Sequence, residues 1–132
     1  MLAIDRVKEV EKGKRIVASK WVSANEFYLA GHFPGQPILP GVLTLEGMIQ
    51  SALLLLEASF SRGVVTGSLQ KVDRVRFKRA ILPGDRVDFL VTLTAQEENL
   101  WKFKGKAQVG EETAAEADLH VKVDVREVGF DL

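Results

Sequence analysis

Two neighbouring segments of the chain carry residue types that can move protons. The first is the stretch 31–41, where His32 stands among closely spaced Gly and Pro residues. The second follows directly and contains Glu46, an acid in a largely apolar segment. Histidine and carboxyl side chains are common general bases and general acids in enzymes. The two residues therefore predict proton-transfer chemistry, provided that the fold brings them together.

Glu46 must be positioned by a helix, predicted over residues 40–60. Pro40 suits the first helical turn, where its missing N–H costs nothing. Apolar residues recur at helical spacing at five positions, Val42, Leu45, Ile49, Leu53 and Leu56. Because Leu54 and Leu55 make another side apolar, the helix is predicted to be buried, partly against a partner subunit.

The start of this helix is suited to stabilising an oxyanion. The first N–H groups of a helix are free, and the helix dipole is positive there. Gly41 has no side chain, so a substrate carbonyl can approach its amide closely. Gln50 lies one turn beyond Glu46 on the same helix face, which makes it a candidate hydrogen-bond partner of the acid.

The rest of the chain alternates apolar and polar residues, which predicts antiparallel strands with one covered face. The clearest strands are 86–95, 101–109 and 115–125, preceded by a shorter one at 72–79 and by two N-terminal ones at 2–10 and 14–22. With 132 residues, the chain is predicted to form a single domain. One buried helix and such a sheet predict an α+β fold in which the sheet wraps around the helix.

Composition excludes several classes of function. The chain has no Cys, so a disulfide framework, a thiol nucleophile and a thiolate metal site are all excluded. With two His in total, a zinc site would need carboxylate ligands, which is uncommon. The 18 basic residues are balanced by 18 acidic ones, which argues against nucleic-acid binding.

No targeting or membrane segment is expected. The N-terminus lacks the apolar core of a signal peptide. The longest apolar stretch, 42–56, is interrupted by Glu46 and Gln50 and is shorter than the roughly 20 residues that span a bilayer. We therefore expect no membrane insertion and a cytoplasmic location.

Each candidate residue also has a purely structural interpretation. His32 can be a hydrogen-bonded loop residue, Glu46 a solvent-reaching charge or ion-pair partner, and Gln50 an ordinary helix residue. His120 alternates with charged residues on the polar side of a predicted strand, so we expect it to be solvated. His32 differs because it stands beside a Gly- and Pro-framed helix start that carries an isolated acid.

Taken together, these motifs resemble a known family. The run Gly31-His32-Phe33-Pro34-Gly35 through Pro40-Gly41-Val42-Leu43, followed by Glu46 and Gln50, closely resembles the 3-hydroxyacyl-acyl-carrier-protein dehydratases of fatty-acid synthesis. The resemblance covers most of the chain and includes Val75-Arg76-Phe77-Lys78-Arg79 and Pro83-Gly84-Asp85. It implies the hot-dog fold. A Glu rather than an Asp at position 46 is similar to the general dehydratase branch, not the bifunctional dehydratase-isomerase branch.

The resemblance also implies a mechanism. His32 takes the C2 proton of a 3-hydroxyacyl thioester, and Glu46 gives a proton to the departing C3 hydroxyl. The Gly41 N–H holds the thioester carbonyl, Ile38 orients the histidine through its backbone carbonyl, and Phe33 and Gln50 count among the substrate-site residues. The family places the base and the acid on opposite subunits of a dimer, which can assemble into hexamers. It needs no metal or redox cofactor.

Charge distribution suggests where an acidic acyl carrier protein docks. Residues 69–88 are basic in sum, and we expect Lys71, Arg74, Arg76, Lys78 and Arg79 to form the docking patch. The alternative is that these cations simply cover the polar face of a strand.

Departures from the family pattern concern substrate preference. Gly47 stands where Ala is customary, Ala80 stands where Pro is customary, and the aromatic gate of the acyl tunnel is missing near Ser68 and Leu69. The favoured hypothesis is a dehydratase that acts on carrier-bound 3-hydroxyacyl chains. A hot-dog thioesterase and a catalytically weak acyl-binding partner subunit are the alternatives.

Overall fold

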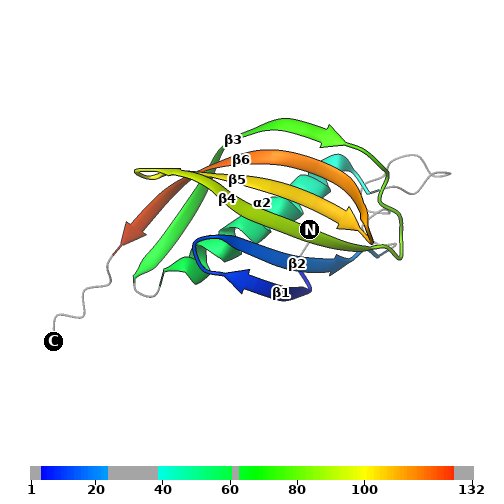
Figure 1. Ribbon diagram of the computed structural model, residues 1–132, viewed down its shortest axis with the longest axis horizontal. Coiled ribbons are helices and arrows are strands. Elements are labelled where there is room, and N and C mark those ends of the chain that lie inside the picture. The colour runs from blue at the N-terminus through cyan, green and yellow to red at the C-terminus, as the bar shows by residue number, and fades with distance from the viewer. Residues whose placement is uncertain (1–3, 24–38, 61–62, 127–132) are drawn as a thin grey trace.

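The computed structural model describes residues 4–23, 39–60 and 63–126. Six antiparallel strands form one sheet in the order β1-β2-β4-β5-β6-β3, and the sheet curves around a single long helix, α2 (Figure 1). This arrangement confirms the predicted α+β architecture. The elements are β1 (Arg6–Glu11), β2 (Arg15–Trp21), α2 (Gly41–Ser59), β3 (Val64–Phe77), β4 (Arg86–Glu97), β5 (Leu100–Val109) and β6 (Glu112–Arg126).

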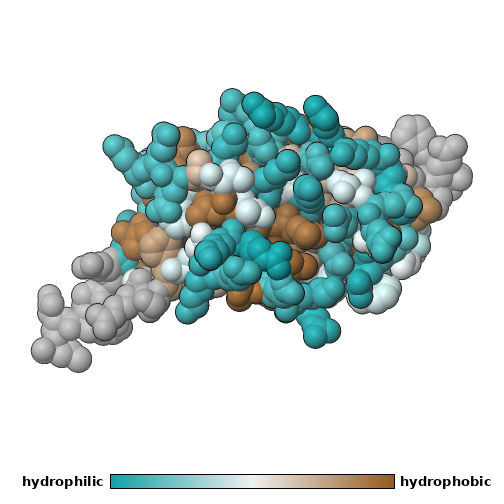
Figure 2. Space-filling view, viewed as in Figure 1, coloured by the Kyte–Doolittle hydropathy of each residue, from teal (hydrophilic) through white to brown (hydrophobic). Residues whose placement is uncertain are grey.

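Strands β4, β5 and β6 follow the predicted alternation over most of their length. The exception is the end of β4, where the pairing register shifts between Leu93 and Ala95 and leaves Ala95 exposed, although Ala95 was predicted on the covered face. On β4 the side chains of Val87, Phe89 and Val91 are completely buried, and on β5 Phe103 and Ala107 are too. The residues between them point to the other face of the sheet, as a period of two requires. The strands cross in front of α2 in the view of Figure 1, and the same view is mainly hydrophilic in Figure 2.

Strand β3 begins at Val64, well before the predicted start at residue 72. Two register shifts interrupt its pairing with β6, one between Leu69 and Lys71 and one between Asp73 and Arg76. At the second shift Arg74 has a φ of 51°. A bulge inserts an extra residue and reverses the inside–outside alternation. Both shifts lie beyond the missed segment 64–69, whose pairing is regular. There Gly67 packs against Leu53 and Leu56 of α2 without a side chain of its own, so the apolar alternation is weak in the sequence.

Helix α2 is central, but its most buried face differs from the predicted one. Thr44, Met48, Ser51, Ala52 and Leu55 are buried, together with Leu56 from the predicted set. Val42, which was predicted to belong to the core stripe, is 70% exposed. Because apolar residues cover more than one side of the helix, the sequence pattern does not single out the side that faces the sheet.

By length and hydropathy alone, α2 could also cross a membrane, and it is the one such helix within the described residues. The core helix of a globular protein meets the same criterion, and Met48, Ala52, Leu55 and Leu56 are almost fully covered by the sheet. Its apolar character is therefore explained by packing inside this fold.

Helix and sheet are in close contact at Gly47. A Cβ at this position would collide with the ring of Phe89, which is completely buried. Since glycine is a poor helix residue, close packing is the physical reason for its presence here.

We predict that Gly47→Ala lowers the free energy of unfolding by about 1–3 kcal/mol, because the overpacking outweighs the better helix propensity of Ala. Chemical denaturation measures the effect. Phe89→Leu removes the colliding ring, so the double variant should be more stable than the two single losses added together. Additive losses would contradict a direct collision between the two positions.

Candidate active site

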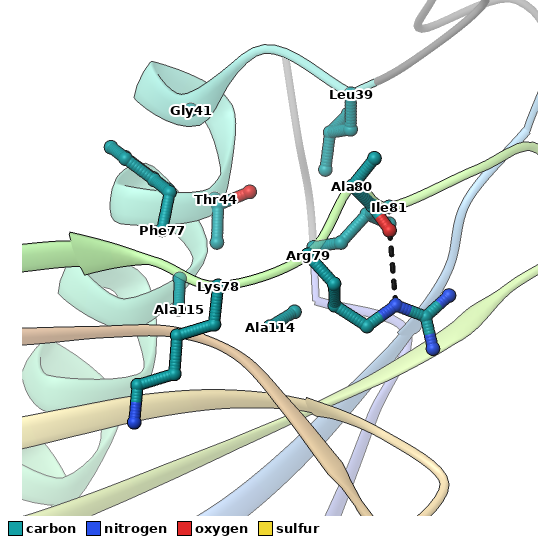
Figure 3. Close-up of a pocket in the computed structure, with 10 residues that line it drawn as sticks. All are labelled: Leu39, Gly41, Thr44, Phe77, Lys78, Arg79, Ala80, Ile81, Ala114 and Ala115. Carbon is teal, nitrogen blue, oxygen red and sulfur yellow. Dashed lines mark hydrogen bonds between the residues drawn. The ribbon is translucent and has the colours of Figure 1, made fainter.

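A pocket of about 420 Å³ opens beside the start of α2 (Figure 3). Its walls come from the first turn of the helix, from the end of β3 with the connection that follows it, and from the start of β6. The lining residues are Leu39, Gly41, Thr44, Phe77, Lys78, Arg79, Ala80, Ile81, Ala114 and Ala115. Most of this lining is apolar or backbone, so the pocket suits an organic chain better than an ion.

Gly41 forms the helix end of the pocket. Pro40 is the N-cap residue, and its carbonyl accepts hydrogen bonds from Leu43 N at 3.0 Å and from Thr44 N at 3.4 Å. The N–H groups before these two have no acceptor within the helix, as at every helix start. A Cβ at Gly41 would lie 2.6 Å from the ring of Phe77. The glycine therefore allows the phenyl ring of Phe77 to pack directly against the backbone at the start of α2.

Glu46 and Gln50 lie together one turn further along α2. The Gln50 side-chain amide donates to Glu46 Oε1 at 3.4 Å in a partly buried setting. This contact is long for a hydrogen bond, so it orients the carboxyl rather than fixing it tightly. The structure thus brings together the two residues that the sequence suggested as partners.

Glu46 and the pocket face different sides of the helix. Thr44 points into the pocket, and Glu46 follows two residues later, which corresponds to a rotation of about 200° around the helix axis. Glu46 is absent from the pocket lining. Within one protomer, the amide proposed for the oxyanion and the proposed acid therefore belong to separate surfaces.

Three predicted site residues, His32, Phe33 and Ile38, lie outside the described residues. Within the described part of the chain, no group of three His, Asp or Glu side chains could hold a metal ion.

Most of the predicted docking cations are engaged by acids in the structure. Four of the five lie within salt-bridge distance of a carboxylate: Lys71 with Asp73 at 3.2 Å, Arg74 with Asp118 at 3.8 Å, Lys78 with Glu116 at 3.3 Å and Arg79 with Asp85 at 3.3 Å. Arg76 is exposed and has no such partner among residues 4–23, 39–60 and 63–126. The net charge of the patch is therefore smaller than the strand alone suggests.

The pKa values of two of these acids are lowered by their cationic neighbours. A hydrogen bond from Lys78 lowers the pKa of Glu116 against the effect of desolvation, with further help from Lys104 and Lys106. Desolvation raises the pKa of Asp73, but hydrogen bonds from Lys71 and His120 outweigh it and leave that pKa lowered. Both carboxylates thus stay charged and hold the cations beside them.

His120 is not the freely solvated residue that we expected. Its Nε2 lies 3.3 Å from Asp73 Oδ1, and its side chain is only 20% exposed. The polar face of a strand can still be shielded by its neighbours, and here β3 lies directly alongside β6. The contact with Asp73 gives His120 a structural partner on the outside of the sheet.

Sequence reasoning missed two groups of residues near the site. Thr44 and Phe77 line the pocket, but only the packing of β3 against α2 reveals this. Lys104 and Lys106 lie near Glu116 and add positive charge beside Arg76. The alternation of apolar and polar residues in 101–109 had already placed these lysines on the polar face of a predicted strand. This alternation was the signal that could have added them to the predicted carrier-docking patch.

The fold recurs in solved structures. A hot-dog-like protein from Thermanaerovibrio acidaminovorans superimposes with a TM-score of 0.73 at 20% identity, covering 88% of this chain and 84% of its own. The fluoroacetyl-CoA thioesterase FlK gives a TM-score of 0.73 at 14% identity, covering 89% and 90%. The sheet and helix therefore define a hot-dog protein, and likenesses at this level of identity show the fold alone.

Sequence comparison defines the family. The model of the FabA-like domain matches residues 1–118. The 3-hydroxyacyl-[acyl-carrier-protein] dehydratase FabZ of Aromatoleum aromaticum is 46% identical over 121 residues, which cover 89% of this chain and 83% of the relative. The chain belongs to the FabA-like family and, within it, to the 3-hydroxyacyl-acyl-carrier-protein dehydratases.

Proposed function

We propose that the protein removes water from 3-hydroxyacyl chains carried by acyl carrier protein, giving trans-2-enoyl products in fatty-acid biosynthesis. The observation that carries the proposal is Glu46, an isolated carboxyl on the central helix. It stands fourteen residues after His32, the only histidine of the Gly- and Pro-rich stretch 31–41 of the sequence. Gln50 supports it from the next turn at 3.4 Å.

The proposed reaction needs one base, one acid and one oxyanion donor. His32 removes the C2 proton, whose acidity comes from the adjacent thioester carbonyl, and the electrons move toward the carbonyl oxygen. A free backbone N–H at Gly41 stabilises the enolate-like charge. Glu46 protonates the C3 hydroxyl, the C3–O bond breaks, and water leaves as the C2–C3 double bond forms. Transfer of the proton from His32 back to Glu46, directly or through water, resets the site.

The site is proposed to form between two copies of the chain. The pocket beside Gly41 holds the amide but not the acid, since Glu46 lies on another side of α2. A second copy can supply the missing group to each pocket. His32 is assigned to the pocket with Gly41 because only nine positions separate the two residues in the sequence.

Strand β3 supports this assembly. Among the strands of the described residues it is an edge strand of 14 residues, and an edge of this length invites pairing with another chain. Its apolar side chains remain exposed, with Phe77 at 55% and Leu69 at 40%. Pairing of two β3 edges would cover them and close the dimer. Further association into hexamers and a cytoplasmic location complete the proposal.

Turnover of defined substrates tests the function directly. The protein is incubated with 3-hydroxybutyryl and 3-hydroxydecanoyl acyl carrier protein, and the products are separated by mass spectrometry. Enoyl product supports the dehydratase. Free 3-hydroxy acid would instead identify a thioesterase, and an unchanged substrate would identify a binding partner without catalysis.

Docking of the carrier is proposed to use Arg76, with Lys104 and Lys106 beside it. We predict that Arg76→Glu raises KM for the acyl carrier protein substrate about fivefold and leaves kcat unchanged. The dependence of this KM on salt concentration should become weaker. A carrier-free 3-hydroxyacyl thioester should react at the wild-type rate. Arg126→Glu is the matched control because Arg126 lies at the other end of the β3–β6 pair. An equal loss with the carrier-free substrate would contradict docking at Arg76.

A further inference from the structure

The connection between β3 and β4 is hydrogen-bonded to Leu39, which lies just before α2. Leu39 N donates to Ile81 O at 2.8 Å, two residues before the helix begins. This hydrogen bond fixes the direction in which the chain enters Pro40 and Gly41. The position of the Gly41 amide therefore depends on where the Ile81 carbonyl lies.

Two charged side chains shape the connection. Arg79 Nε donates to the carbonyl of Ala80 at 3.1 Å (Figure 3), and its Nη2 lies 3.3 Å from Asp85 Oδ2. The same Asp85 oxygen accepts a hydrogen bond from Leu82 N at 2.9 Å. Arg79 and Asp85 thus form hydrogen bonds with the backbone on both sides of Ile81, Arg79 with the Ala80 carbonyl and Asp85 with the Leu82 N–H.

The pair is more enclosed than an ordinary surface ion pair. The side chains of Arg79 and Asp85 are 27% and 22% exposed, and Arg79 also reaches Glu112 at 3.6 Å. The backbone of Asp85 is anchored as well, since its carbonyl accepts from Val22 N at 2.9 Å. In Figure 3 the guanidinium points away from the lining residues Gly41 and Thr44. Arg79 therefore lines the pocket, while its guanidinium is directed toward Asp85 and Glu112.

We propose that Arg79 and Asp85 are positioning residues that set the Gly41 amide through the Ile81–Leu39 hydrogen bond. The inference rests on the proposed function for its catalytic consequence. A mutation far from the reacting atoms can lower a rate greatly when it displaces a catalytic group by about 1 Å. Arg79 then serves the oxyanion site, although the sequence assigned it to carrier docking.

Asp85→Asn separates positioning from docking. Removing an acid near a basic patch favours an acidic carrier, so a docking effect would lower KM. Positioning predicts instead that kcat falls about 10-fold with a carrier-free thioester while KM changes little. Arg79→Met should lower kcat by a similar factor. The double variant should lose no more kcat than either single variant, because the two residues act as a unit. Rates are measured well below the melting temperature of each variant.

Amide hydrogen exchange provides a readout that does not require turnover. The Leu39 N–H should exchange about 10-fold faster in Asp85→Asn and in Arg79→Met than in the wild type. Arg15→Met is the matched control, because Arg15 pairs with Glu9 and Glu11 on the β1–β2 hairpin. It should leave both the Leu39 exchange rate and kcat unchanged. Unaltered Leu39 exchange in the Asp85 and Arg79 variants would overturn the proposal, whereas an inactive wild type would overturn only the proposed function.

Discussion

Glu46→Gln is expected to lower kcat by at least about 100-fold while KM changes little. The substitution keeps the size of the side chain and leaves the contact with Gln50 possible, so the helix should stay intact. What it removes is the proton that the leaving hydroxyl requires. Hydroxide is a poor leaving group, so loss of that proton affects the bond-breaking step and not the binding of the acyl chain.

Steady-state kinetics with a 3-hydroxyacyl thioester, together with circular dichroism and thermal unfolding, measure this effect. Glu57→Gln is the matched control, because Glu57 is the next acid along α2 and its side chain is exposed. It should retain the wild-type kcat. Full activity of Glu46→Gln would remove Glu46 from the mechanism, and an equal loss in both variants would show that helix charge matters rather than a specific acid.

The helix could be predicted from its long apolar run, and the last three strands because their alternation of apolar and polar residues extends over most of each strand. The strand predicted at 86–95 corresponds to β4 (Arg86–Glu97), and that at 115–125 to β6 (Glu112–Arg126). The early half of β3 was missed because Gly67 stands at a position that faces α2, where an apolar side chain would have marked the strand. Helix burial was predicted, but the buried side was not, since only packing against the sheet distinguishes Met48 from Val42.

The candidate site shows a similar division. Local spacing is enough to relate Glu46 to Gln50, because residues four apart share a helix face. It is not enough to find Phe77 beside Gly41 or Ile81 beside Leu39, since these contacts join segments about forty residues apart. Ion pairs between distant segments are equally hidden in the sequence. The five predicted docking cations looked free in the sequence, but four of them lie near acids, and two of these acids, Asp118 and Glu116, come from β6.

Mixed dimers of His32→Ala and Glu46→Gln chains should regain activity that neither variant has alone. In a dimer with shared sites, one chain of the mixed pair contributes an intact His32 and the other an intact Glu46. One of its two sites is then complete, and the second lacks both groups. Isolated mixed dimers should therefore have roughly half of the wild-type activity, and an unfractionated equimolar mixture with random assortment roughly a quarter.

The experiment uses two affinity tags, so that mixed dimers are isolated by successive purification after co-expression. Each parent, purified in the same way, should be at least about 100-fold less active than the wild type. Purified mixed dimers that remain as inactive as their parents would place both groups within one protomer. That result would conflict with the geometry of α2, because Gly41 and Thr44 line the pocket while Glu46 lies on another side of the helix. Restored activity requires Glu46 to act in the pocket of the neighbouring copy.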